Sequence, residues 1–276
     1  MGLPPDSRAR ARSIKESACD QAAAAFYDPD RLGAGLAQAN IVSDVAGSAC
    51  LREASMPDPA PRLHYLLGRA LVAKHDAQGA RRQFELAVSK GYRAARVDLA
   101  RVLVDAPSGS FDPRRAAMLY QQAWTLGVPI AAFEMGHLYE FGAHGPDAAA
   151  HNRIDPDLLK AWSWYQKGAE AGEPNALARF AERDEKAAVA ENTPAKRYAL
   201  LLAAFRSYAA AAERAKDENW PDDAWRNWRY HRATIARLLA REGMMQQVAD
   251  AYTQVRDKSS VHPPTLWDRI QSMLHL

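Results

Sequence analysis

A six-position pattern that occurs three times restricts the fold of this chain more than any other feature. The pattern is a small residue, an aromatic residue at +4, a small residue at +7, glycine at +11, alanine at +15 and an apolar residue at +19. The copies begin at Ala80, Ala116 and Ala161. Self-similarity of this kind is the sequence signature of a repeat architecture, in which each unit packs on its neighbours. The chain is therefore expected to consist of repeated structural units.

Each copy of the pattern predicts a helix, a tight turn and a second helix. Residues three and four apart are neighbours on a helix, so positions +0, +4 and +7 form one stripe along a single face. Small residues on that stripe let the next helix approach closely, and the aromatic residue fills the remaining space. Glycine at +11 suits the left-handed conformation that ends many helices. Alanine dominates the apolar composition and also favours helix over strand. The expected fold class is all-α.

A small residue inside each following helix extends the register across four units. The spacings between these landmarks are 32, 36 and 45 residues, and the landmarks are Gly68, Ala100, Gly136 and Ala181. The longest spacing contains an insertion at 143–153 whose Gly145-Pro146 predicts a loop. Asp112-Pro113 and Asp155-Pro156 each place a capping residue before a proline, which is typical of the start of a helix.

Three regions follow from this register. Residues 1–60 form an N-terminal extension with one helix at 43–54, capped by Ser43 or Asp44, and with both cysteines. Residues 61–185 hold the repeats. Residues 186–276 form a helical C-terminal region.

The C-terminal region is expected to end the solenoid. It contains a helical run at 195–216, a break at Trp220-Pro221 and a final pair at 224–241 and 245–256. The spacing of Gly68, Ala80 and Phe84 recurs in Ala236, Val248 and Tyr252. This pair is interpreted as a divergent tetratricopeptide-like unit that caps the array, since terminal repeats are expected to be atypical.

The segments Met118–Gly142 and Ala161–Ala176 resemble Sel1-like repeats, a family related to tetratricopeptide repeats. The resemblance implies a right-handed superhelical solenoid of antiparallel helix pairs that is used for protein–protein contact. The function expected from it is a non-enzymatic scaffold or adaptor that binds a partner protein or peptide. Two alternatives remain: a regulatory or partner-binding region of a larger enzyme or signalling protein, and an enzyme built on a helical solenoid.

The usual signatures of catalysis and of cofactor binding are missing from the sequence. It has no glycine-rich phosphate loop, no His-Glu-x-x-His helix and no Gly-x-Ser-x-Gly elbow, so no catalytic residue and no cofactor is assigned. No metal site is assigned either: His137, His144 and His151 recur every seven residues, but glycine and proline between them break any shared helix.

Neither nucleic acid nor a membrane span is expected. The net charge is +3, whereas nucleic-acid-binding domains usually carry a stronger basic patch. The arginines of 226–241 have aromatic neighbours, but they fit the polar face of an amphipathic helix. The tryptophans of the second half are interpreted as packing between helices, with a recognition surface as the alternative. No stretch approaches the ~20 apolar residues of a membrane helix.

The two cysteines are expected to form a disulfide bond. Cys19 before the segment Asp28-Pro29-Asp30-Arg31, with Cys50 inside an Ala-Cys helix, resembles exported bacterial repeat proteins. That resemblance implies a Cys19–Cys50 bridge and an oxidising compartment, the bacterial periplasm, with a signal peptide absent from this sequence. Two buried thiols in a cytoplasmic protein are the alternative.

The binding surface is expected on the concave face of the solenoid, which the first helix of each pair lines in tetratricopeptide-type folds. Equivalent positions beside the landmarks should stack along this groove. The expected partner-binding residues are Tyr65, Arg69, Arg101, Phe133 and His137. A basic row beside aromatic rings fits an acidic or C-terminal peptide segment. The competing interpretation is that Arg69 and Arg101 pair with acidic residues of adjacent helices.

Overall fold

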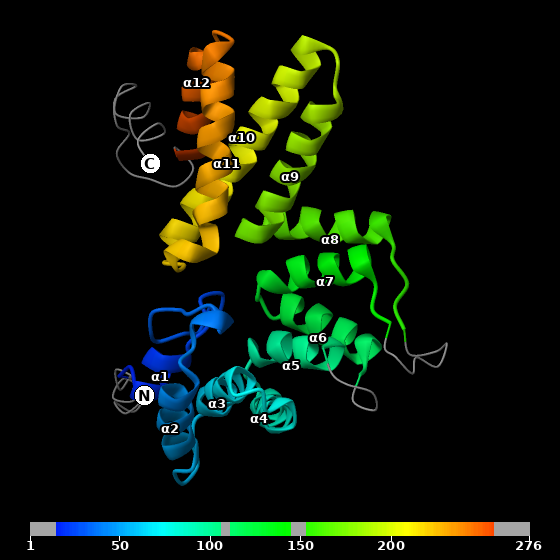
Figure 1. Ribbon diagram of the computed structural model, residues 1–276. Helices are drawn as coiled ribbons and strands as arrows, with labels where there is room; N and C mark the ends of the chain where they lie inside the picture. Colours follow the sequence, from blue (N-terminus) through cyan, green and yellow to red (C-terminus); the bar gives the residue numbers. More distant parts are fainter. Residues whose placement is uncertain (1–14, 106–110, 145–152, 257–276) are drawn as a thin grey trace, which may run out of the picture. The chain divides into compact units, whose positions relative to one another are not determined.

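The computed structural model describes residues 15–105, 111–144 and 153–256, which form helices joined by short turns (Figure 1). The all-α prediction is confirmed for these residues. The chain divides into two compact units, Met1–Ala95 and Arg96–Leu276. This division falls inside the stretch 61–185 that was assigned to repeats. The N-terminal extension and the first helical pair therefore belong to one unit.

Unit 1 is a helical pair with an N-terminal segment, residues 15–41, packed against it. Its helices are α1 (Ala18–Ala23), α2 (Ser43–Ala54), α3 (Pro61–Ala73) and α4 (Ala77–Ser89), with a 3-10 turn at Gln38–Asn40. Helices α3 and α4 pack through Gly68 and Phe84. A Cβ at Gly68 would lie 2.4 Å from the Phe84 ring, so the small landmark is the hollow that receives this aromatic side chain.

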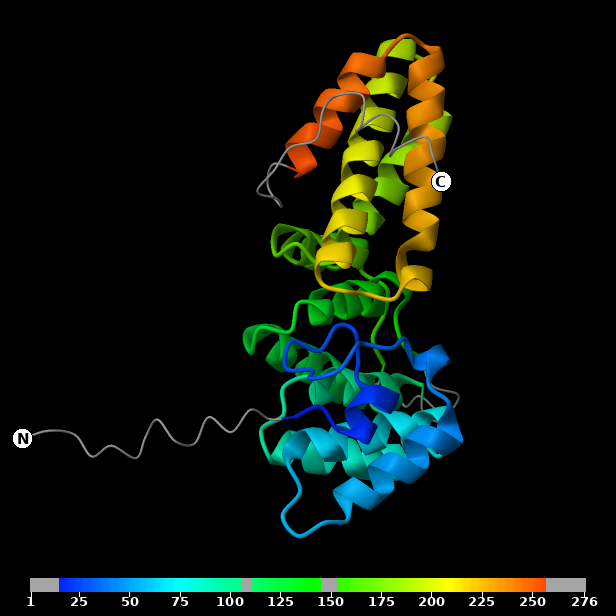
Figure 2. The same ribbon diagram turned by 90° about the vertical axis from the view of Figure 1, so that its left-hand side faces the viewer.

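Unit 2 continues the succession of helices (Figures 1 and 2). They are α5 (Ala95–Val104), α6 (Pro113–Thr125), α7 (Ile130–Phe141), α8 (Leu158–Glu170), α9 (Pro174–Ala190), α10 (Pro194–Asp217), α11 (Asp222–Arg241) and α12 (Met245–Arg256). Helix α10 lies between α9 and α11 and packs against both (Figure 1). A landmark glycine again receives an aromatic side chain of the next helix: a Cβ at Gly136 would lie 2.4 Å from the Tyr165 ring.

The glycine of each pattern copy has the backbone conformation that its position predicted. Gly91, Gly127 and Gly172 have φ values of 88°, 75° and 78°, in the left-handed region. The residue after each glycine donates its N–H to the carbonyl oxygen five positions earlier, over 2.8–3.0 Å. This is the Schellman arrangement, which satisfies carbonyl groups at a helix end. The predicted helix–turn–helix units are confirmed at all three sites.

Two predicted helix starts differ from the structure. Helix α8 is capped by Asp157, whose side chain accepts a hydrogen bond from the Lys160 N–H, and not by Asp155. The backbone bridge between Ala143 and Ile154 extends the chain up to Pro156 and so delays the helix by two residues. Helix α2 begins after Val42 without a side-chain cap. Most of the predicted insertion loop, 145–152, lies outside the described residues.

The final helical pair buries the stripe that the sequence predicted. Ala236, Val248 and Tyr252 are 1–4% exposed, and Gly243 ends α11 with a φ of 77°. The tryptophans Trp220, Trp225 and Trp228 are also buried, 6–9% exposed, so they serve the packing between helices that was expected of them.

The turn glycines provide a direct test of the register. Gly127→Val is expected to lower the free energy of unfolding by about 1–2 kcal/mol, because a β-branched side chain is strained at positive φ. Gly127→Asn should cost clearly less, since asparagine tolerates this conformation. Thermal unfolding followed by circular dichroism measures both. Equal melting temperatures for the wild type and the valine variant would contradict the assigned turn.

Candidate functional site

The structure places the five predicted binding residues in two very different environments. Tyr65 and Arg69 lie in unit 1 and are 0% and 1% exposed. Tyr65 packs between the rings of Phe84 and Tyr92, with centroid distances of 6.0 and 5.1 Å. These two residues are therefore not available to a partner, and their assignment to a binding groove is wrong. The other three residues lie together in unit 2.

Arg69 is buried because the N-terminal segment of the chain covers it. Its guanidinium donates hydrogen bonds to the carbonyl oxygens of Ala23, at 2.6 Å, and Leu36, at 3.0 Å. The side-chain amide of Gln38 donates in turn to the Arg69 carbonyl at 3.0 Å. Among the described residues, no acidic side chain pairs with Arg69. Arg69 supplies hydrogen-bond donors to carbonyl groups of irregular backbone, which lack the hydrogen bonds that a helix would provide.

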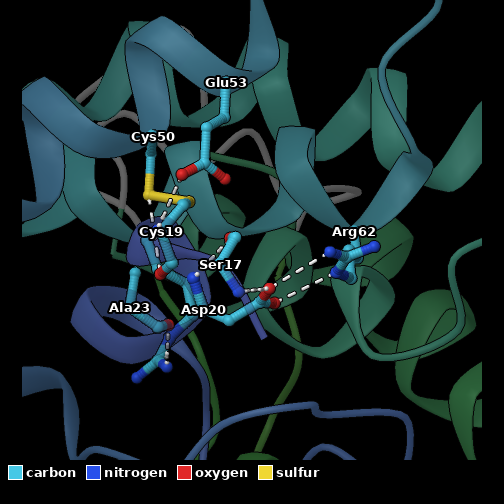
Figure 3. The surroundings of a disulfide bond; sticks show 8 residues. Ser17, Cys19, Asp20, Ala23, Cys50, Glu53 and Arg62 are labelled. Carbon is cyan, nitrogen blue, oxygen red and sulfur yellow. Dashed lines mark hydrogen bonds and ion pairs between the residues drawn. A yellow bond between two sulfur atoms is a disulfide. The ribbon is translucent and has the colours of Figure 1, made fainter. Parts of the chain in front are cut away.

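An ion pair and a disulfide bond attach α1, at the start of the same segment, to the other helices of unit 1 (Figure 3). Cys19 and Cys50 are joined with an S–S distance of 2.03 Å, as the resemblance implied. The Arg62 guanidinium grips the Asp20 carboxylate through two hydrogen bonds of 3.0 and 3.1 Å. Burial alone would raise the pKa of Asp20, but the hydrogen bonds from Arg62 and Ser17 outweigh it and hold this pKa below its usual value.

In unit 2 the expected basic character of the groove is cancelled by neighbouring carboxylates. Arg101 donates to Asp98 on its own helix at 2.8 Å and to Glu134 of α7 at 2.6 Å. The alternative interpretation, pairing with acidic residues of adjacent helices, is therefore confirmed for Arg101. With Arg69 buried and Arg101 neutralised, the predicted basic row is not formed.

Arg101 and His137 line one cavity of about 490 Å³ between α5, α6 and α7. Such a volume suits a single amino-acid side chain or a small ligand. Acidic and aromatic side chains also line it, among them Asp105, Tyr120, Glu134 and Phe141. Tyr120 is a pattern aromatic that was expected to serve packing alone, and its place in this cavity was missed.

His137 also belongs to a row of rings that crosses three helices, here called the aromatic ribbon. Neighbouring rings have centroid distances of 4.6–6.2 Å, within the range of favourable aromatic contact. The ribbon consists of Phe141, His137 and Phe133 on α7, Tyr165 and Trp162 on α8, and Phe180 on α9. The sequence predicted Phe133 and His137 as binding residues, and Trp162 belongs to the tryptophans for which a recognition surface was the alternative to packing. Phe141 continues the i, i+4, i+8 spacing of Phe133 and His137 and could have been found in the same way.

The ribbon is anchored on one side and open on the other. Tyr165 is fully buried and donates its hydroxyl to Glu140 at 2.6 Å, while Arg179 pairs with Glu140 and stacks over the Tyr165 ring. By contrast, Phe141 is 61% exposed and His137 is also exposed. Arg183 stacks over the partly exposed Phe180 at 4.7 Å. The ribbon therefore offers apolar ring surface to solvent and is anchored at Tyr165.

A second cavity of about 540 Å³ lies in the C-terminal part of unit 2, beside α9, α10 and α12. Its floor is formed by Leu177, Ala210 and Ala251, and charged side chains such as Arg206 surround it. No sequence prediction pointed to this cavity.

The histidine series and the basic helix α11 are the places where the sequence could have indicated a metal or nucleic-acid site. In the described part of the chain, no three His, Cys, Asp or Glu side chains gather as metal ligands would. His151 lies outside the described residues, and His144 pairs with Asp155 at 3.0 Å. On α11, Arg229 stacks over Trp225, and the buried Arg232 pairs with Glu213, so part of this basic helix serves internal packing.

Comparisons with known proteins give matches among solved structures. No protein-family model matches the chain. No curated protein matches it either. The chain is similar to the crystal structure of a Sel1 repeat protein from Oxalobacter formigenes, with 15% sequence identity and a TM-score of 0.43, over 79% of this chain and 95% of that one. It is also similar to c5321, a protective antigen present in uropathogenic Escherichia coli strains displaying an SLR fold, with 13% identity and a TM-score of 0.39, over 83% of this chain and 63% of that one.

Proposed function

We propose that this protein is a non-enzymatic interaction protein that binds a partner protein or peptide on the aromatic ribbon of unit 2. The observation that carries the proposal is the ribbon itself, six rings in contact of which Phe141 and His137 are exposed beside a cavity. Aromatic residues dominate the binding energy of protein interfaces, because they bury large area with few rotatable bonds. An exposed aromatic surface that is already rigid loses little entropy when a partner binds.

The binding residues are proposed to be Arg101, Phe133 and His137 from the original prediction, joined by Phe141 and Trp162. The acidic or C-terminal partner expected from the sequence has less support, since the Arg101 guanidinium already contacts two carboxylates. A partner carboxylate would have to compete with both.

The compartment is proposed to be oxidising, and the bacterial periplasm fits best, with the cytoplasm as the alternative. Support comes from the Cys19–Cys50 disulfide, because such bonds persist mainly outside reducing compartments. None of the helices in the described part of the chain combines the length and the apolar character that crossing a bilayer requires.

Selection from a phage-displayed random peptide library, followed by calorimetry of the best peptide, tests the proposed surface. Phe141→Ala is expected to weaken binding at least about tenfold, the effect of losing an interface hot spot. The matched control is Met118→Ala on α6, because Met118 is 59% exposed, like Phe141, and lies outside the ribbon and both cavities. Its affinity should stay within about twofold of the wild type.

Two results would contradict this placement. One is an unchanged affinity for Phe141→Ala in a folded variant. The other is a loss of affinity on changing Arg206 of the second cavity instead, which would move the binding surface to the C-terminal helices. A covalently changed library peptide, or turnover of a substrate, would favour the enzyme alternative.

A further inference from the structure

The cavity between α5, α6 and α7 carries more negative than positive charge. The lining carboxylates Asp105 and Glu134 lie beside the Arg101 guanidinium and His137, and Arg101 also pairs with Asp98 next to the cavity. Glu134 uses Oε1 to accept from Arg101, and its Oε2 accepts no hydrogen bond from any residue that the structure describes. No described residue donates a hydrogen bond to the Asp105 side chain, which interacts with Arg101 and His137 through charge alone. Two carboxylate groups of this cavity are therefore open to a positively charged donor.

Tyr120 gives a second and independent indication of a ligand. The residue is 2% exposed and lines the cavity, yet its hydroxyl makes no hydrogen bond within residues 15–105, 111–144 and 153–256. This hydroxyl opens onto the cavity and bonds to no described residue, so it can contact a polar group that enters there. The charges that act on this hydroxyl are those of Glu134, Arg101, Asp105 and Asp98. Tyr120 therefore adds a polar atom to the same acidic cavity.

Burial is the main reason why the pKa values of Tyr120 and Asp105 in this cavity are raised. Burial raises the pKa of Tyr120, and the charge of Glu134 raises it further, so the phenol stays protonated at neutral pH. Partial burial raises the pKa of Asp105, which lines the same cavity; the Arg101 charge opposes this effect, Glu134 adds to it, and His137 also opposes it. A cation between these groups would relieve the repulsion.

We infer that this cavity binds the ammonium or guanidinium group of a lysine or arginine side chain of the partner. The charged group would donate hydrogen bonds to Glu134 Oε2, to the Asp105 carboxylate and to the hydroxyl oxygen of Tyr120. Its alkyl stem would lie along Phe141 and Leu138, which line the same wall. Carboxylates beside an aromatic face recognise cations through charge-assisted hydrogen bonds and the negative face of the ring. The inference rests on the proposed function, because it names the partner chemistry of the same surface.

The test uses the whole chain with methyl-labelled leucine and valine, because Val104 and Leu138 both line the cavity. The probe is n-butylammonium, titrated at pH 8 with EDTA present, so that histidines are neutral and metal ions are excluded. We expect saturable shifts of these two methyl signals with n-butylammonium, and none at equal concentrations of butyrate or 1-butanol.

Three variants link the response to the assigned groups. Glu134→Gln and Tyr120→Phe are each expected to weaken n-butylammonium binding at least about fivefold, since each removes a hydrogen bond to a charged group. Tyr120→Phe should keep the wild-type melting temperature, because its hydroxyl bonds to no described residue. If Tyr120 served packing alone, its substitution would not weaken binding while leaving the melting temperature unchanged. Glu170→Gln is the control, because Glu170 is an exposed acid outside this cavity.

The inference is overturned if butyrate binds as well as n-butylammonium, if no signal saturates, or if Tyr120→Phe and Glu134→Gln both bind like the wild type. The library experiment judges the proposed function separately. Peptides that depend on Phe141 but show no preference for lysine or arginine would leave the proposed function standing without this cavity. Saturable n-butylammonium binding without any selected peptide would support the cavity and count against the proposed function.

Discussion

Arg69→Met is expected to lower the free energy of unfolding of unit 1 by about 2–4 kcal/mol, because two buried carbonyl groups lose charged hydrogen-bond donors at once. The guanidinium of Arg69 bonds the Ala23 and Leu36 carbonyl oxygens and is 1% exposed. Methionine fills a similar volume but donates nothing. The loss should therefore appear first in the N-terminal segment, as faster amide hydrogen exchange in residues 24–41.

The matched control is Arg82→Met, on the exposed face of α4. This variant removes the same charge from the same helical pair without touching the segment, and its stability should change by less than about 0.5 kcal/mol. Equal effects of the two substitutions would mean that net charge, and not the clamp on the segment, accounts for the result. Unchanged exchange in residues 24–41 of Arg69→Met would show that Arg69 does not hold the segment.

The repeat architecture could be predicted because one stripe of residues determines both the helix and its neighbour. Ala116, Tyr120 and Ala123 are 0–2% exposed, and Gly127 ends their helix at positive φ. Periodicity of this kind depends on residues close in sequence, so it is readable without a structure. The landmark glycines could be placed for the same reason. That Gly68 receives Phe84 and Gly136 receives Tyr165 is a contact between helices that only the structure shows.

The N-terminal segment could not be predicted in this way. Helix α1 has six residues, and the chain after it follows no regular period. Its position depends on long-range partners such as Asp20 with Arg62 and Asp30 with Arg93. Neither pair has a spacing that identifies it in the sequence. One feature of the sequence indicated that this region is attached to the first helices: the Cys19–Cys50 bridge implied by the resemblance to exported bacterial repeat proteins.

Only some of the proposed binding residues could be predicted, because a position in a repeat shows where a residue lies on its helix and nothing more. Equivalent positions share their place on a helix, but they do not share what covers them. Arg69 and Arg101 are equivalent in register, yet one lies under the N-terminal segment and the other between Asp98 and Glu134. Phe133 and His137 lie on the α7 face that remains open. Register therefore placed Phe133 and His137 on the α7 face where the binding surface is proposed, but it misjudged the charge beside them.

The disulfide is expected to contribute the largest single stabilisation in unit 1. Cys19 and Cys50 are 31 positions apart, and the chain-entropy relation gives about 3–4 kcal/mol for a loop of this size. The double variant Cys19→Ala, Cys50→Ala should lose this amount, because its unfolded chain is no longer restricted by the crosslink. Denaturant unfolding of unit 1, with and without dithiothreitol, measures the difference.

The reductant distinguishes the crosslink from the packing of the two sulfur atoms. Reduced wild-type protein should unfold at nearly the same denaturant concentration as the double variant, whereas dithiothreitol should leave the variant unchanged. Arg62 still holds Asp20 in both, so α1 should stay attached at low denaturant concentration. Two titratable thiols in the denatured, unreduced wild type would show that the bond does not form, and the proposed oxidising compartment would then lose its support. A variant as stable as the oxidised wild type would instead show that the bond gives unit 1 no net stabilisation.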